Sequence, residues 1–176
     1  MPAPPGVGGG SFPVSGIVLE TERLRLALES PGELLARIEA LSPAEREEVS
    51  PEWLARVREA EESDPWLHGF SIRNRASGAV VGACGFKGVP NAEGIVEIAY
   101  AVNPVHQGLG YATEASRALV EFAFRTGRVR VVRAHTKPDN AASQRVLAKC
   151  GFESLGEVND PEDGLVRRWE RTRKPA

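Results

Sequence analysis

The chain has 176 residues, of which 41% are hydrophobic and 26% charged, as in a globular protein large enough to bury its own core. Its formal net charge of −2 gives the whole chain no electrostatic reason to bind nucleic acid, so no direct nucleic-acid partner is expected. No apolar run approaches the length of a membrane span, and Cys84 and Cys150 lack nearby metal ligands, which argues against zinc and suits a cytoplasmic protein.

The first segment of the chain has the composition of a linker. Residues 1–16 hold four of the 13 prolines and five of the 18 glycines, with few apolar side chains that could dock onto a core. We therefore expect a flexible leader over residues 1–16, followed by a single domain over residues 17–176.

Apolar periodicity and turn residues predict the elements that follow. The predicted strands cover residues 21–28, 66–73, 79–86, 94–102, 128–136, 152–158 and 165–172. The predicted helices cover residues 31–41, a segment that begins after Ser50, the residues between Gly110 and Gly127, and a short segment that Gly151 closes. This order predicts a mixed α/β domain with a central, mostly antiparallel sheet flanked by helices.

The most informative segment is the glycine turn Gln107-Gly-Leu-Gly-Tyr-Ala112, which lies between a predicted strand and a predicted helix. Gly108 and Gly110 let the backbone approach a ligand without interference from a Cβ atom. The first N–H groups of the helix and the positive end of its dipole converge on one spot, which is how proteins bind phosphate. A phosphorylated cofactor is the first hypothesis, and an ordinary connection that uses glycine for tightness is its alternative.

The turn and a later segment together resemble a known superfamily. Residues 107–112 are similar to the Gln/Arg-x-x-Gly-x-Gly/Ala turn of the GNAT N-acetyltransferases, which bind acetyl-CoA. Residues 110–115, with Asn-x-x-Ser-x-x-Val-Leu-x-Lys-x-Gly-Phe over 140–152, resemble the RimJ/RimL-like branch, the ribosomal-protein N-terminal acetyltransferases. The opening Thr-Glu-Arg-Leu-Arg-Leu over 21–26 is similar to the way that branch begins. The resemblance implies the acyl-CoA N-acyltransferase fold.

The resemblance also implies acetyl-CoA as cosubstrate. The end of the strand before the turn would pair by its main chain with the pantetheine arm and polarise the thioester carbonyl. Gln107 stands where relatives often have arginine, so the backbone donors carry more of the phosphate contact, while its amide closes the turn. The implied cofactor-binding residues are Ala101, Val102, Gln107, Gly108, Leu109, Gly110, Tyr111, Ala112 and Asn140.

Two residues are candidates for proton transfer. Glu97 is similar in place to the catalytic glutamate of the histone acetyltransferase branch, and a partly buried carboxylate suits removal of the amine proton, directly or through water. Its alternative is a solvated strand residue. Ser143 shares a helix face with Asn140 and could protonate the departing thiolate, although capping is the alternative role of both. Many relatives have a tyrosine where this chain has Leu147, so a serine acid and no acid at all both stay open.

These assignments predict an N-acetyltransferase that moves an acetyl group from acetyl-CoA to a primary amine within a ternary complex. The amine is a protein N-terminus or a small molecule, and dimers are common among the relatives, which makes a homodimer possible. The alternative is a non-catalytic domain that binds or senses acyl-CoA. Another nucleotide-binding enzyme is disfavoured because the turn lacks the Gly-Lys-Ser/Thr ending of a P-loop. Cys150 has no adjacent base, so a covalent acyl-enzyme is not expected.

Overall fold

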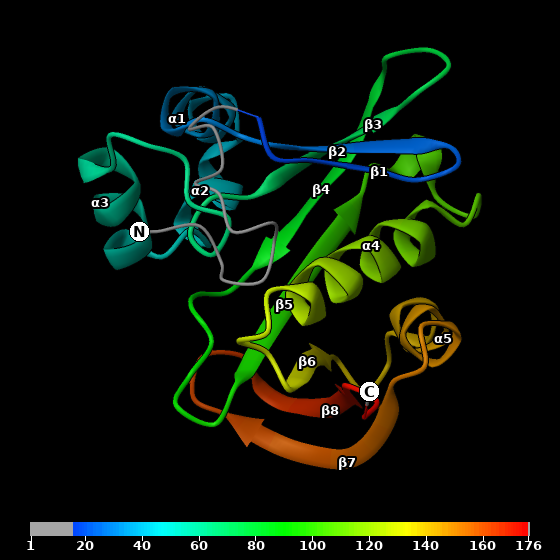
Figure 1. Cartoon of the computed structure of the whole chain (residues 1–176). Helices are drawn as coiled ribbons and strands as arrows, with labels where there is room; N and C mark the ends of the chain where they lie inside the picture. The colour runs from blue at the N-terminus through cyan, green and yellow to red at the C-terminus, as the bar shows by residue number, and fades with distance from the viewer. Residues whose placement is uncertain (1–15, 176) are drawn as a thin grey trace.

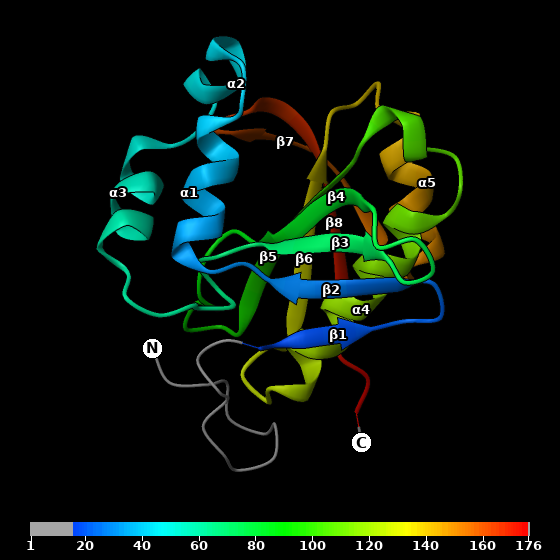
Figure 2. The same ribbon diagram turned by 90° about the horizontal axis from the view of Figure 1, so that it is seen from above.

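The computed structural model describes residues 16–175, which form an eight-stranded sheet with helices packed around it (Figures 1 and 2). The strands are β1 (Val18–Glu20), β2 (Leu24–Leu28), β3 (Phe70–Asn74), β4 (Val80–Phe86), β5 (Ile95–Val102), β6 (Val131–Thr136), β7 (Glu153–Asp160) and β8 (Gly164–Thr172). The helices are α1 (Pro31–Glu39), α2 (Pro43–Glu47), α3 (Pro51–Glu59), the short 3-10 helix η1 (Pro104–His106), α4 (Tyr111–Arg125) and α5 (Ala141–Lys149). The predicted leader 1–16 lies, apart from Gly16, outside the described residues.

The sheet opens beside β5. The strand order is β1-β2-β3-β4-β5-β6-β8-β7, and all neighbours are antiparallel except β5 and β6, which α4 connects as a parallel crossover. Their pairing covers only residues 95–97 of β5 and 131–133 of β6. Residues 98–102 therefore pair with β4 on one side and with no described strand on the other. The predicted mixed α/β class, with a mostly antiparallel sheet, is confirmed.

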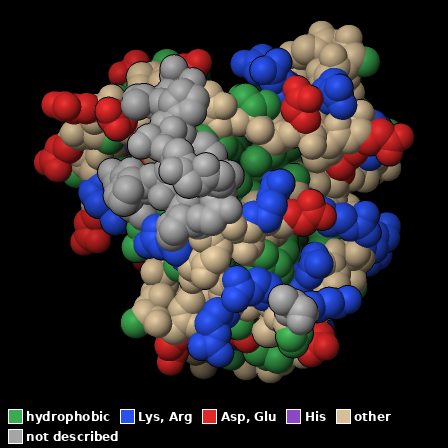
Figure 3. Space-filling view, viewed as in Figure 1, with side chains coloured by type: hydrophobic (Ala, Val, Ile, Leu, Met, Phe, Trp, Pro, Cys, Tyr) green, Lys and Arg blue, Asp and Glu red, His purple; other side chains and the backbone are tan. Residues whose placement is uncertain are grey.

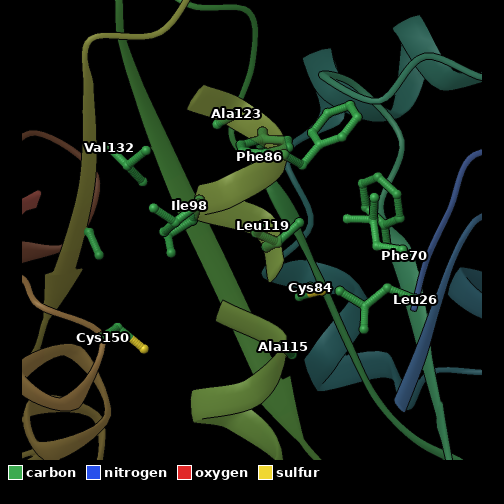
Figure 4. Close-up of a cluster of buried hydrophobic side chains, with 14 of the residues drawn as sticks. Leu26, Phe70, Cys84, Phe86, Ile98, Ala115, Leu119, Ala123, Val132 and Cys150 are labelled. Atoms are coloured by element: carbon green, nitrogen blue, oxygen red, sulfur yellow. The ribbon is translucent and has the colours of Figure 1, made fainter. Parts of the chain in front are cut away.

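The main core lies between α4 and the sheet (Figure 4). Ala115, Leu119 and Ala123 share one face of α4 at helical spacing and pack over strand residues such as Leu26 and Ile98. Each fully buried leucine of this kind contributes about 1.5–3 kcal/mol through the hydrophobic effect. The core therefore fixes α4, and the turn that precedes it, firmly against β5.

A second, smaller core joins α1 to α3. Leu34 and Ile38 of α1 meet Val57 of α3, with Trp53 and Leu67 packed around them. The three N-terminal helices gather on one side of the molecule, whereas α4 crosses the sheet and α5 lies on the opposite side (Figures 1 and 2). The two helical groups thus lie on opposite sides of the opened strand β5 (Figure 2).

Three local predictions differ from the structure. β1 lies ahead of the strand predicted in this region, and its three residues are too few for a visible alternation. α2 has no buried side chain, so periodicity gives no sign of it, and its local signal is the capping box formed by Ser42 and Glu45. Residues 66–69, predicted as strand, are irregular because the backbone N–H of His68 bonds back to the carbonyl of Asp64.

Surface charge is uneven despite the small net charge. Lys and Arg side chains gather in the lower part of the face drawn in Figure 3, near the C-terminal end of the chain. Arg130, Arg173 and Lys174 line a surface cavity in that region. Within residues 16–175, no helix combines the length and the apolar character that a bilayer crossing needs.

Candidate functional site

The glycine turn has the backbone that the sequence predicts. Gly108 and Gly110 have φ angles of +78° and +83°, a region in which any other residue is strained. Gly110 is the N-cap of α4 and offers no side-chain cap, so the first N–H groups of the helix have no side-chain acceptor there. The Gln107 amide donates to the carbonyl of Val102 at 3.0 Å and ties the turn to the end of β5.

Arg23 reaches this turn from the connection between β1 and β2. Its Nη1 donates to the carbonyl of Leu109 at 2.8 Å, its Nε donates to Glu114 at 3.2 Å, and its guanidinium carbon lies 4.8 Å from the centre of the Tyr111 ring. These contacts clamp the turn and place a permanent positive charge beside it. The opening motif over residues 21–26 contains Arg23, but the sequence gives no sign of this contact because Leu109 lies 86 positions away.

A cavity of about 440 Å³ lies between the end of β5, the glycine turn and α5. The site residues predicted from the sequence that line it are Ala101, Val102, Gln107, Gly108, Gly110, Tyr111, Ala112, Asn140 and Ser143. Leu109 and Glu97 are absent from this lining. Arg145 and Lys149 of α5 and His106 of η1 add basic groups, and none of the described lining residues is acidic. The cavity therefore suits a ligand with several negative charges.

A second cavity of about 490 Å³ lies on the other face of β5. Side chains alternate across a strand, and because the Tyr100 hydroxyl reaches α5, Ala99 and Ala101 point to the opposite face, where they line this cavity. Its walls also come from α1, α3, β4 and the turn between β7 and β8, with Arg37, Trp53, Arg56, Lys87 and Glu162 among them. Tyr100 and Ala101 line both cavities, which therefore meet at the open end of β5.

The main chain of β5 faces the two sides alternately. The N–H of Lys87, just past β4, donates to the carbonyl of Glu97, and the N–H of Asn103, just past β5, donates to the carbonyl of Val81 in β4. In an antiparallel ladder the bonded residues alternate, so the odd-numbered positions between them, Ala101 included, direct their N–H groups to β4. The N–H groups that face the opening belong to Tyr100 and Val102. Tyr100 and Val102 can therefore donate main-chain hydrogen bonds to a ligand in the opening. Ala101 only lines the two cavities there.

Glu97 is held by a chain of side chains. Its Oε1 lies 2.8 Å from His135 Nδ1 and 3.3 Å from Lys87 Nζ. Arg168 Nε donates to His135 Nε2 at 3.1 Å, and since an arginine only donates, the proton of the neutral imidazole lies on Nδ1 and points to Glu97. Oε2 makes no hydrogen bond with any residue of the described part of the chain. The carboxylate is 23% exposed and lies on the Ala99 face of β5, next to the cavity that Lys87 lines.

Tyr100, Ser143 and Asn140 meet at the start of α5. The Tyr100 hydroxyl lies 2.7 Å from Ser143 Oγ, and burial raises the pKa of this phenol above its ordinary value. Asn140 is the N-cap of α5 and accepts the N–H of Ser143 at 3.1 Å, so it fills the capping role named as its alternative while also lining the cavity. Leu147 is fully buried in the core and presents no polar group.

Cys150 is a poor nucleophile in this setting. It is a free cysteine, 2% exposed, with its thiol 3.5 Å from the carbonyl of Thr113. Burial raises the pKa of the thiol, although Arg117 and Arg171 oppose the shift. The thiol therefore stays protonated at neutral pH, as expected for a packing residue.

Comparison with known proteins gives a family match. Residues 25–153 match the profile of the acetyltransferase (GNAT) domain. The uncharacterized N-acetyltransferase YjdG of Bacillus subtilis (strain 168) is 35% identical over 89 residues, which is 51% of this chain and 51% of that protein. The chain spans about half the length of the curated relatives it matches.

Solved structures share the fold. RimL, a ribosomal-protein alpha-N acetyltransferase solved with coenzyme A, superposes with a TM-score of 0.68 at 18% identity, covering 89% of this chain and 98% of that one. The aminoglycoside acetyltransferase AAC(6')-Ib, also with coenzyme A, superposes with a TM-score of 0.64 at 24% identity, covering 85% of this chain and 95% of that one. At these identities the likeness concerns the fold.

Proposed function

Because the chain belongs to the GNAT acetyltransferase family, as its motifs predict, we propose that it transfers an acetyl group from acetyl-CoA to a primary amine. The transfer is direct, within a ternary complex, and the acceptor is a protein N-terminus or a small-molecule amine. The observation that carries the proposal is the meeting of two cavities at Tyr100 and Ala101, one basic and next to the glycine turn, the other on the opposite face of β5. Ligands in these two cavities would meet at this point.

The basic cavity suits acetyl-CoA. The N–H groups of the glycine turn and the start of α4 suit its pyrophosphate, and the flanking charges of Arg145 and Lys149 suit its phosphates. These cations offset the glutamine at position 107, where relatives often have arginine. The free N–H groups of Tyr100 and Val102 would pair with the pantetheine arm and hold the thioester carbonyl, stabilising the oxyanion that forms there. No metal is part of the proposal.

Glu97 is the proposed base for the amine proton. Side chains two apart share a strand face, and at about 3.3 Å per residue Ala101 lies roughly 13 Å along the strand from Glu97. This span is too long for direct contact with an amine at the junction, so the proton passes through water to Oε2. The contacts of Oε1 with His135 and Lys87 support this assignment because they fix the carboxylate and leave Oε2 available.

Calorimetry and a coenzyme A release assay test the proposal together. Acetyl-CoA is titrated into the protein, and release is then followed with three acceptors: an alanine-initiated peptide, kanamycin and spermidine. We expect binding of acetyl-CoA and release that depends on one of these amines. Binding without amine-dependent release would favour the non-catalytic sensor, which the buried Leu147 supports by leaving no tyrosine acid on α5. Failure to bind coenzyme A or acetyl-CoA would overturn both.

The remaining expectations are proposals as well. The two free, buried cysteines support a cytoplasmic location, where thiols stay reduced. Limited proteolysis tests the division into a leader over residues 1–16 and one domain over residues 17–176. Light scattering tests the homodimer.

A further inference from the structure

Tyr100 and Ser143 form a polar contact across the cofactor cavity. Tyr100 extends from β5 to the first turn of α5, with its hydroxyl 2.7 Å from Ser143 Oγ and 3.3 Å from the carbonyl oxygen of the same residue. Both residues line the cavity beside the glycine turn. The Asn140 cap holds the N–H of Ser143, so the position of the serine is fixed by the start of the helix.

Either hydroxyl can donate across the 2.7 Å contact, and the two arrangements leave different protons available to the cavity. The phenol has one proton, and its shorter contact is to Oγ. When Tyr100 donates to Oγ, the proton of the serine is free, because Ser143 Oγ has no other hydrogen-bond partner among residues 16–175. That proton can then be donated to an acceptor inside the cavity.

We propose that Tyr100 and Ser143 form a proton relay to the sulfur of the departing coenzyme A, with Ser143 in contact with the sulfur and Tyr100 behind it. This inference rests on the proposed acetyl transfer. As the carbon–sulfur bond breaks, its electron pair stays on sulfur, which takes the proton of Ser143 while Ser143 takes that of Tyr100. The Tyr100 phenolate then regains a proton from solvent. Tyr100 acts through Ser143 and is thus a positioning residue.

The surroundings of Tyr100 suit a phenol that stays protonated until negative charge develops on the departing sulfur. Burial raises the pKa of the phenol, and the contact with Ser143 opposes that shift. The thiols of Cys84, opposite Tyr100 on β4, and of Cys150 also have raised pKa values because of burial, so both stay neutral. Arg145 and Lys149 in the same cavity favour a transient phenolate. The phenol of this chain therefore comes from the strand, whereas many relatives place it at the position of Leu147.

Single and double substitutions test the relay. With the acceptor that the amine panel identifies, Tyr100→Phe and Ser143→Ala should each lower kcat by on the order of 100-fold and change the KM for acetyl-CoA by less than about twofold. The double variant should be no slower than the slower single variant, because both remove one pathway. Ser154→Ala, on β7 and outside both cavities, is the matched control and should keep the kcat of the wild type. Independent, multiplying losses would overturn the relay.

A spectroscopic measurement reports on the contact without turnover. The chain has two tyrosines, so tyrosine labelled with carbon-13 at the ζ position gives two signals, and Tyr100→Phe identifies that of Tyr100. Adding coenzyme A should move this signal in the wild type and move it much less in Ser143→Ala. An equal movement in both proteins, or full kcat in Tyr100→Phe, would overturn the relay alone. A wild type that binds no coenzyme A, or binds it without turnover, would overturn the acetyl transfer and the relay together.

Discussion

Glu97 is held through one oxygen and left open at the other. Oε1 accepts from His135 and faces Lys87, while Arg168 fixes the imidazole tautomer from behind. From the sequence, His135 has the pattern of an ordinary strand histidine, because its contact with Glu97 depends on the parallel pairing of β5 with β6. The glutamate could be named as a candidate base from its motif, and that role stays a prediction. The residues that orient it were not predictable, since they come from distant strands.

Replacing this carboxylate should separate binding from chemistry. In Glu97→Gln we expect kcat to fall by about 100- to 1,000-fold, because the amide cannot take the amine proton. The dissociation constant for acetyl-CoA should change by less than about twofold, since Glu97 lies outside the lining of the basic cavity. Steady-state kinetics and calorimetry measure the two values. Glu157→Gln, an exposed carboxylate on β7, is the control, and an unchanged kcat in Glu97→Gln would remove the base assignment.

Replacing Cys150, in contrast to Glu97, should leave the activity unchanged. Cys150→Ala should keep kcat within about twofold of the wild type, because burial raises the pKa of its thiol and leaves it protonated. The native protein should also react slowly with iodoacetamide at this position, as mass spectrometry of the intact chain would show. A folded variant with no activity would instead support a covalent acyl-enzyme.

The proposed binding of acetyl-CoA depends on the glycine turn. In Gly110→Ala, a side chain at φ +83° costs about 1–2 kcal/mol of stability, and its Cβ would lie 3.2 Å from Arg23 Nη2. The strain shifts the backbone of the turn, so that one N–H group loses its bond to a phosphate. Such a loss costs about 1.5–3 kcal/mol, and acetyl-CoA should therefore bind roughly tenfold more weakly or worse. Thermal unfolding and calorimetry measure the two effects.

A matched glycine separates strain from binding. Gly156 has a φ of +90° on β7, and a Cβ there would have no neighbour within 4 Å. Gly156→Ala should therefore lose similar stability and keep its affinity for acetyl-CoA. Equal loss of affinity in the two variants would mean that the turn acts only through overall stability.

Elements with local signals were predictable, and elements without them were not. Ser50, Asn140 and Gly151 mark helix ends through short-range hydrogen bonds or a positive φ, and each has that role in the structure. The clamp that Arg23 places on the glycine turn joins segments far apart in the chain, so no window of sequence contains it. β1 was not predicted either, because its identity as a strand depends on its pairing with β2.

Across the whole molecule, one buried histidine makes stability depend on pH. His68 is fully buried, its Nδ1 accepts the N–H of Asp64, and burial lowers its pKa despite the opposing carboxylates of Asp64 and Glu29. The unfolded chain binds a proton near pH 6.5, while the folded protein resists it. Below about pH 6.5 the unfolded state therefore binds more protons, and stability falls as the pH falls.

Calorimetry at pH 7.5 and 5.5 checks this effect. The Tm of the wild type should fall over this range, and that of His68→Asn, which keeps an acceptor for Asp64, should fall less. The lowered pKa of Asp160, caused by backbone N–H donors, affects stability only at more acidic pH, because it concerns a carboxylate. Equal decreases in the two proteins would assign the acid sensitivity to other groups.

The short pairing of β5 with β6 leaves an opening in the sheet between these two strands. Among the described residues, the two cavities on the faces of the sheet share only Tyr100 and Ala101, so the proposed ligands would enter and leave from opposite faces. In the proposed reaction, neither product would have to leave before the other. A bisubstrate inhibitor would carry its linker through this opening. Its two halves can be optimised as separate fragments, one for each face of the sheet.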